Sequence, residues 1–240
     1  MKKLLSSKAN QSAQGEKHKN KMNTTRHPTH DTRHPTIYPV ILAVPGKAQQ
    51  LKGREKVSFL SRHARSALEI SAQKSGLKLT RLIKGENGEP LPFDGNYWSL
   101  THKTGYVGGV IASTMIGMDL EKIRPCSAAL FRKTAQDSEW RLSNEDPTRL
   151  FFRYWTSKES VLKASGTGIR DFSKCRIFKI VDHNHLIINY KDQDWFIEHQ
   201  DFDGHIASVV KNRFNVEWTI LPAPLNETVK RHVGQMNNGT

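Results

Sequence analysis

The chain has 240 residues, of which 36% are hydrophobic and 25% are charged, a composition typical of a globular protein with some disordered sequence attached. No apolar run approaches the roughly 20 residues of a membrane-spanning helix, which argues against a membrane protein. Two cysteines and the lack of an apolar signal-peptide segment predict a cytoplasmic protein without a disulfide framework. The net charge of +14 predicts an anionic partner, such as a nucleic acid, a phosphorylated cofactor, an anionic lipid or an acidic protein.

The first 36 residues form a basic leader. They contain eight lysines and arginines against two acidic residues, and very few apolar side chains. Such a segment cannot bury enough apolar surface to offset the entropy lost on ordering, so we expect residues 1–36 to be disordered. Ordered structure is expected to begin with an apolar, strand-like run at 37–42.

The next part of the chain predicts a helix followed by strands. Apolar residues recur at helical spacing over 55–75, and Gly76 is a suitable helix stop. Residues 77–83 alternate well enough to predict a strand. Turn signals follow, and two further strands are expected at 97–102 and 106–112.

The second half repeats this order. We expect a strand at 116–121, a weakly patterned helix at 127–142, and a second helix that Asp146 or Thr148 caps. This second helix is expected to run to about residue 164 and to stop at Gly166. Four apolar runs then predict a strand-rich meander, at 175–181, 186–190, 195–199 and 205–210.

The repeated order of elements predicts an α+β protein with two lobes of similar size. We place the N-terminal lobe at 37–112 and the C-terminal lobe at 113–225. Residues 226–240 are polar and are expected to form a loose tail.

Three carboxylates and a lysine are candidates for a metal and phosphate site. Asp119 and Glu121 are two residues apart on a predicted strand, so both side chains point to the same face. Glu159 on the long helix would supply a third oxygen ligand, and oxygen ligands alone suit Mg²⁺. Lys163 follows Glu159 by one helical turn and could contact a phosphate oxygen. Taken separately, Asp-x-Glu is common at solvated sheet edges, and Glu159 with Lys163 is a surface pair worth roughly 0.3 kcal/mol.

Four sequence elements in this order resemble the signature motifs of 4′-phosphopantetheinyl transferases of the larger, Sfp-type class. They are Trp-Ser-Leu-Thr-His at 98–102, Gly-Met-Asp-Leu-Glu at 117–121, Phe-Phe-Arg-Tyr-Trp-Thr-Ser-Lys-Glu-Ser-Val-Leu-Lys at 151–163, and Gly-Thr-Gly at 166–168. The resemblance covers about 50–210.

The resemblance implies a pseudo-dimer of two α+β lobes with coenzyme A bound in the cleft between them. It implies transfer of the phosphopantetheine arm to a serine of an apo carrier protein, with release of adenosine 3′,5′-bisphosphate. Asp119, Glu121 and Glu159 would bind Mg²⁺, with Mn²⁺ as the alternative, and Glu159 would also act as the base. Lys163 would neutralise charge on the pyrophosphate.

The resemblance also implies contacts to the rest of the coenzyme and to a partner. Thr101 and His102 would meet the region of the 3′-phosphate, and Lys56 and Arg62, near the start of the first helix, are the candidate phosphate-binding cations. An ordinary solvated helix face is the alternative for Lys56 and Arg62. An acidic acyl or peptidyl carrier protein would be attracted by the basic surface. We expect a monomer without a membrane partner.

One position departs from the family pattern. Many relatives have a lysine or arginine in the turn at 88–90, where this chain has Glu89 between Gly88 and Pro90. Lys84 or Lys103 could replace that cation. The departure leaves an inactive family member as one alternative function. A basic nucleic-acid-binding protein is another, although the sequence has no helix-turn-helix, zinc-finger or RNP-like pattern.

Overall fold

The computed structural model describes residues 34–86 and 88–223, and these form an α+β fold, as expected. Residues 1–33 of the expected basic leader and all of the expected tail at 226–240 lie outside this part of the chain. The strands are β1 (Thr36–Ile37), β2 (Val40–Ala43), β3 (Tyr97–His102), β4 (Tyr106–Ala112), β5 (Met118–Lys122), β6 (Arg176–Ile180), β7 (His185–Tyr190), β8 (Gln193–Phe202), β9 (His205–Val210), β10 (Asn215–Val216) and β11 (Thr219–Leu221). The α-helices are α1 (Gly46–Gln49), α2 (Gly53–Lys74), α3 (Ala128–Thr134), α4 (Asp137–Trp140) and α5 (Pro147–Ser165), and a 3₁₀ helix, η1, spans Ile169–Lys174.

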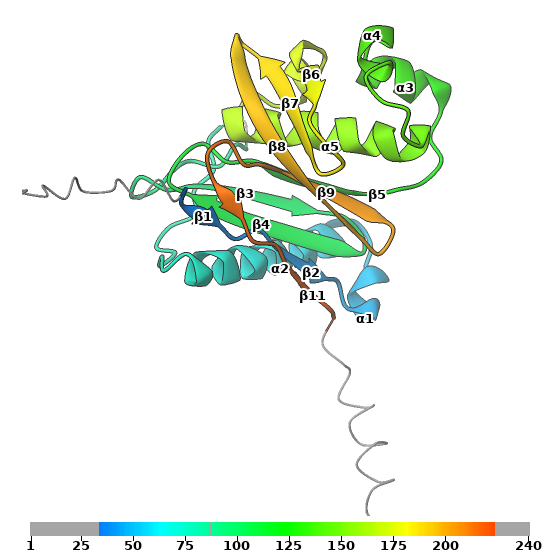
Figure 1. Cartoon of the computed structure of the whole chain (residues 1–240). Coiled ribbons are helices and arrows are strands. Elements are labelled where there is room, and N and C mark those ends of the chain that lie inside the picture. The colour runs from blue at the N-terminus through cyan, green and yellow to red at the C-terminus, as the bar shows by residue number, and fades with distance from the viewer. Residues whose placement is uncertain (1–33, 87, 224–240) are drawn as a thin grey trace, which may run out of the picture. The chain divides into compact units, whose positions relative to one another are not determined.

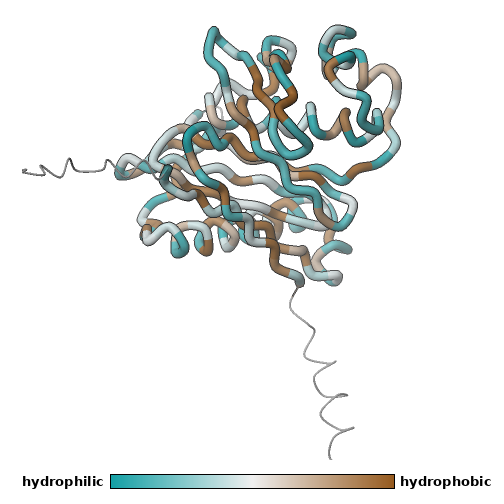
Figure 2. The backbone as a smooth tube through the Cα atoms, viewed as in Figure 1, coloured by the Kyte–Doolittle hydropathy of each residue, from teal (hydrophilic) through white to brown (hydrophobic). Residues whose placement is uncertain are grey.

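The strands form two main sheets that lie between the two long helices. The first sheet has the order β11-β2-β4-β3 and the second has the order β5-β9-β8-β7-β6. In Figure 1, α2 lies beneath the first sheet and α5 lies against the second. The largest hydrophobic cluster joins both sheets and α5, with members such as Ile41, Val110, Leu120 and Val161. Figure 2 shows hydrophobic stretches, in brown, along the central strands.

The first sheet is held closely against α2 by small residues. A Cβ atom at Gly109 of β4 would lie 2.6 Å from the backbone nitrogen of Leu68, so only glycine allows this approach. Val40 and Leu42 of β2 face α2, whereas Ile41 between them belongs to the cluster shared with the second sheet. This alternation is the pattern expected of a strand buried on both faces.

Local sequence signals determine where α5 begins and ends. Its N-cap is Asp146, whose carboxylate accepts a hydrogen bond from the backbone nitrogen of Arg149 at 2.8 Å. Its C-cap is Gly166, which has a positive φ of 68° that glycine adopts without strain. The helix therefore spans the length that the sequence predicts, and Asp146 rather than Thr148 caps it.

Several expected elements differ in detail. Residues 77–83 form no strand; Leu77, Leu79 and Leu82 pack against a cluster around Trp98, but no neighbouring strand pairs with their backbone. The expected helix at 127–142 is two short helices, α3 and α4. The expected strand at 37–42 is interrupted at 38–39, because Pro39 has no N–H for a ladder.

The end of the described chain returns to the first half of the molecule. Strand β11 pairs in parallel with β2, and β10 pairs in parallel with β1. The expected lobe 113–225 thus includes strands that pair with strands from before residue 113. None of the helices described here is long and apolar enough to cross a membrane.

Candidate functional site

The site forms where edge strand β3 of the first sheet meets edge strand β5 of the second. The backbone nitrogen of Met118 donates to the hydroxyl of Ser99 at 3.1 Å. Two residues further along β3 and one residue further along β5, the hydroxyl of Thr101 donates to Oδ1 of Asp119 at 2.9 Å. Alternate side chains of a strand share a face, so this pair of contacts fixes β3 against β5 and positions the Asp119 carboxylate.

Two lysines pair with the carboxylates of β5. Lys163 Nζ donates to Oδ1 of Asp119 at 2.7 Å and to the carbonyl oxygen of Met118 at 3.1 Å. Lys103, in the turn after β3, lies 2.5 Å from Oε1 of Glu121. Both carboxylates are buried, and the lysines supply the opposite charge that such burial requires.

Glu159 lies on α5 one turn before Lys163, half-buried among these charges. Burial raises the pKa of the Glu159 carboxyl, and the negative charge of Asp119 raises it further, while Lys163 and Lys103 act in the opposite direction. A carboxyl group with a raised pKa is a stronger base than one in water.

The chemistry of this cluster suits a hard metal ion, although its present geometry is that of ion pairs. Oδ2 of Asp119 is buried and has no hydrogen-bond partner among the residues that the structure describes. The nearby donors are carboxylate oxygens, which Mg²⁺ prefers. Within residues 34–86 and 88–223, no three His, Cys, Asp or Glu side chains are close enough together to hold a metal. Lys163 and Lys103 occupy positions beside two of the three expected ligands.

The close approach of α5 to β5 depends on Gly117. A Cβ atom at this position would lie 1.8 Å from the carbonyl oxygen of Ser160 and 2.7 Å from the backbone nitrogen of Ala164. Glycine is therefore needed just before β5 so that Lys163 can reach Asp119.

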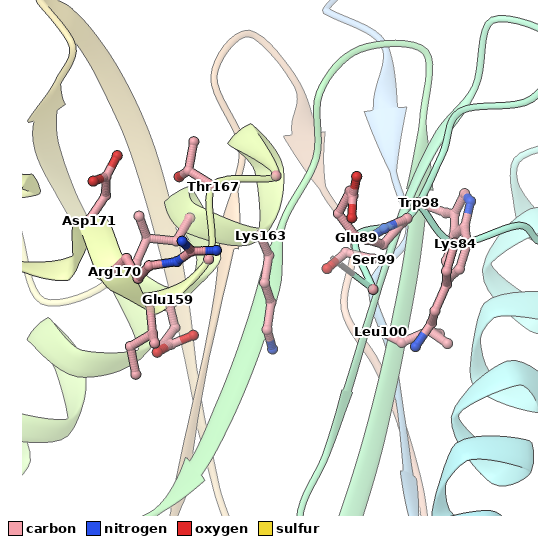
Figure 3. Close-up of a pocket in the computed structure, with 16 residues that line it drawn as sticks. Lys84, Glu89, Trp98, Ser99, Leu100, Glu159, Lys163, Thr167, Arg170 and Asp171 are labelled. Atoms are coloured by element: carbon pink, nitrogen blue, oxygen red, sulfur yellow. The ribbon is translucent and has the colours of Figure 1, made fainter. Parts of the chain in front are cut away.

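A cavity of about 630 Å³ opens beside Glu159 and Lys163, a size suited to a small-molecule ligand. Its remaining lining comes from the segment 84–90, from β3 and from the chain after α5: Lys84, Gly88, Glu89, Pro90, Trp98, Ser99, Leu100, Leu162, Gly166, Thr167, Gly168, Ile169, Arg170 and Asp171. Figure 3 shows Glu159 and Arg170 on one side, Lys84 and Trp98 on the other, and Lys163 between them.

His102 lies in a positively charged part of the site. Burial lowers the pKa of His102, and the charges of Lys163, Lys103 and Lys84 lower it further. An imidazole that is surrounded by cations remains neutral at a pH where a solvated histidine would begin to charge. Three ammonium groups and an imidazole within electrostatic reach of one another favour an anionic ligand such as phosphate.

The structure brings together most, but not all, of the residues that the sequence selects. Asp119, Glu121, Glu159 and Lys163 converge with Thr101 and His102. The hydroxyl of Thr101 donates its hydrogen bond to Asp119. Lys56 donates to the carbonyl oxygen of Gln49 and Arg62 to the hydroxyl of Ser58; neither lines the cavity.

Ser99 and Arg170 belong to the site but were not selected from the sequence. Ser99 joins the two sheets, and its position two residues before Thr101 is a signal that could have identified it. Arg170 lines the cavity from η1. It has no comparable signal, because its position depends on how the chain turns after Gly168.

Comparisons with known proteins agree on one family. The chain is 40% identical over 68 residues to the 4′-phosphopantetheinyl transferase HetI of Nostoc sp., covering 26% of this chain and 29% of that protein. It is 27% identical over 89 residues to the 4′-phosphopantetheinyl transferase psf-1 of Bacillus pumilus, covering 35% and 38%. It is 26% identical over 181 residues to a putative 4′-phosphopantetheinyl transferase of Haemophilus influenzae, covering 69% and 75%.

The first two of these matches span less than two fifths of each relative's length, and they therefore say little about the whole protein. The family model of the 4′-phosphopantetheinyl transferase superfamily matches residues 115–210. This range contains β5, α5 and the strands of the second sheet, and with them the Asp119, Glu121, Glu159 and Lys163 side chains. Residues 115–210, which hold most of the candidate site, are therefore similar to the 4′-phosphopantetheinyl transferase superfamily.

Proposed function

We propose that this protein is an Sfp-type 4′-phosphopantetheinyl transferase that modifies a serine of an apo acyl or peptidyl carrier protein. The observation that carries the proposal is the ion pair between Lys163 on α5 and Asp119 on β5, together with Glu159 and Lys163 on the wall of the cavity. These residues lie within the part of the chain that matches the family. Coenzyme A would occupy the cavity as the donor.

In the proposed reaction, the serine oxygen of the carrier attacks the phosphorus that bears the pantetheine arm. A new bond forms between that oxygen and phosphorus, and the bond to adenosine 3′,5′-bisphosphate breaks. Glu159 would take the serine proton. Lys163 would neutralise the negative charge that develops on the leaving phosphate.

The three carboxylates would hold a divalent metal, Mg²⁺ or alternatively Mn²⁺. Asp119 has one buried oxygen without a partner, and Glu121 and Glu159 supply further hard donors nearby. When bound, the ion would neutralise the pyrophosphate of coenzyme A and polarise the bond under attack.

The partner in this proposal is an acidic carrier protein, because the chain carries a net charge of +14. Opposite charges would accelerate the encounter, and the rate of association should fall as salt is added. The protein would act as a monomer.

The test incubates the full chain with coenzyme A, Mg²⁺ and a panel of apo carrier proteins, and follows the intact mass of each carrier. A gain of one phosphopantetheine arm supports the proposal. If no carrier gains mass, and the protein instead binds DNA or RNA tightly and in a salt-dependent manner, the proposal is wrong.

Glu159→Gln tests the role of the base. It keeps the size of the side chain but removes its charge and its ability to accept a proton, so transfer should fall by about 100-fold or more. Glu69→Gln, an exposed position on α2, is the matched control and should retain full activity. A turnover of Glu159→Gln within a few-fold of wild type would exclude Glu159 as base and ligand.

A further inference from the structure

We propose that Lys84 is a binding residue for a phosphate group of the nucleotide ligand, on the cavity wall opposite Glu159. This inference rests on the proposed function, because it takes coenzyme A as the ligand. The sequence offers Lys84 and Lys103 equally as substitutes for the cation absent at position 89, and the matched range 115–210 does not include Lys84.

The position of Lys84 is set by the turn that follows it. Lys84 forms an isolated antiparallel bridge with Pro90, and the backbone nitrogen of Gly85 donates to the carbonyl oxygen of Glu89 at 2.8 Å. These contacts close the segment into a tight loop, with Lys84 on one arm and Glu89 on the other. Both side chains line the cavity.

Unlike the other two lysines of the site, Lys84 forms no ion pair with a carboxylate of the described residues. Lys103 and Lys163 each have a carboxylate partner, whereas the described residues place no carboxylate within ion-pair distance of Lys84. Its side chain is exposed, and Figure 3 shows it across the cavity from Glu159. An unpaired ammonium on the wall of a cavity is available for an anionic ligand.

Lys84 lies close enough to the other two lysines to add to the same positive potential. The charges of Lys84, Lys163 and Lys103 all lower the pKa of His102, so the three ammonium groups contribute to one positive region. A phosphate that enters this region gains attraction from each of them, and Lys84 is the one that has no carboxylate partner among the described residues to release first.

The carboxylate of Glu89 adds a negative charge to the cavity wall, on the arm of the loop opposite Lys84. This carboxylate lies over Gly85, where an added Cβ atom would be 2.2 Å from Oε1 of Glu89. Oε2 is buried without a hydrogen-bond partner. This negative charge on the cavity wall opposes phosphate binding, and Lys84 lies on the other arm of the same loop to offset it.

The experiment measures the affinity of the full-length protein for coenzyme A and for 3′-dephospho-coenzyme A by calorimetry. Lys84→Met keeps the length of the side chain and removes its charge, and it should weaken coenzyme A binding by about tenfold, as expected for one charge-assisted contact. Lys78→Met is the matched control, since Lys78 is also exposed but does not line the cavity, and it should bind as wild type does. A loss confined to coenzyme A assigns Lys84 to the 3′-phosphate, whereas an equal loss with both ligands assigns it to the pyrophosphate.

A second variant separates charge from damage to the loop. In Lys84→Met combined with Glu89→Lys, the cation returns on the facing arm, and affinity should recover. Binding by Lys84→Met within twofold of wild type, or a loss that the double variant does not restore, overturns the inference.

If wild type transfers the arm and binds coenzyme A but Lys84→Met binds equally well, only the role of Lys84 is wrong. If wild type neither binds coenzyme A nor transfers the arm, the proposed function fails as well.

Discussion

At the scale of single residues, Lys158 and Glu159 are neighbours in sequence but lie in different environments. Successive helical residues point about 100° apart, so only one of them can face the cavity. Lys158 turns inward, where its ammonium donates to the carbonyl oxygen of Thr134 at 2.7 Å and to Oε1 of Glu139 at 3.0 Å. Its side chain is 1% exposed. Lys158 therefore joins α5 to the segment 128–140 and takes no part in the chemistry.

The buried pair of Lys158 and Glu139 should be essential for folding. Burial raises the pKa of the Glu139 carboxyl, but Lys158 and the backbone N–H groups of Gln136 and Ile177 outweigh burial and hold the pKa below its usual value. Glu139→Gln leaves the Lys158 charge buried without a counter-charge, and this should cost about 3–5 kcal/mol of unfolding free energy. Urea unfolding followed by fluorescence measures the loss.

Asp137→Asn is the control for this variant, because Asp137 is exposed in the same short helix. It should cost less than about 1 kcal/mol. Equal urea midpoints for Glu139→Gln and wild type would mean that the pair contributes little to stability.

At the scale of elements, the contact between α5 and β5 depends on Gly117. Gly117→Ala would place a methyl group against the backbone of α5, with the carbonyl oxygen of Ser160 at 1.8 Å. Because backbone cannot move as a side chain can, the helix must shift, and we expect a loss of about 1–3 kcal/mol in stability. The shift would also separate Lys163 from Asp119 and reduce transfer.

Gly105→Ala is the matched control, since its nearest contact would be His205 Nε2 at 3.8 Å, an ordinary distance. Both variants are compared by thermal unfolding and by the carrier mass assay. A Gly117→Ala protein that is as stable and as active as Gly105→Ala would show that α5 can move without consequence.

Elements with a complete local signal were predictable from the sequence. Helix α2 and helix α5 have helical periodicity and recognisable ends, and the structure has them within a few residues of the predicted limits. Residues 77–83 also alternate, but a strand needs a partner, and local sequence does not specify one. The break between α3 and α4 also has no local sequence signal. The backbone turns at residues 135–136, which places Glu139 beside Lys158, a residue distant in sequence.

The sequence predicts which residues of the site lie near one another, but not which contacts they make. The order of the motifs identifies Asp119, Glu121, Glu159 and Lys163 as candidate site residues. The ion pairs were not predictable, because Lys103 reaches Glu121 only when β3 and β5 lie edge to edge. The hydrogen bond from the Thr101 hydroxyl to Asp119 also depends on the contact between β3 and β5.

At the scale of the whole described unit, residues 215–221 connect its two halves. After the second sheet is complete, β10 and β11 return to pair with β1 and β2. Lys74 of α2 lies 2.9 Å from Glu217, and Trp218 Nε1 donates to Glu198 of β8 at 3.1 Å. The last strands therefore contact both sheets, so neither half should be fully stable without them.

Two truncations test this connection. A chain that ends at Phe214 loses β10 and β11 together with Trp218, and it should lose at least about 3 kcal/mol of unfolding free energy, the scale of one large aromatic residue removed from a core. A chain that ends at Ala223 keeps all of these contacts and should unfold at the wild-type urea concentration. Both are compared by urea unfolding at equal protein concentration. Because β11 belongs to the first sheet, the shorter chain should also expose the edge of β2 and aggregate more readily. Equal midpoints for the two truncated chains would mean that the first sheet is stable without its returning strand.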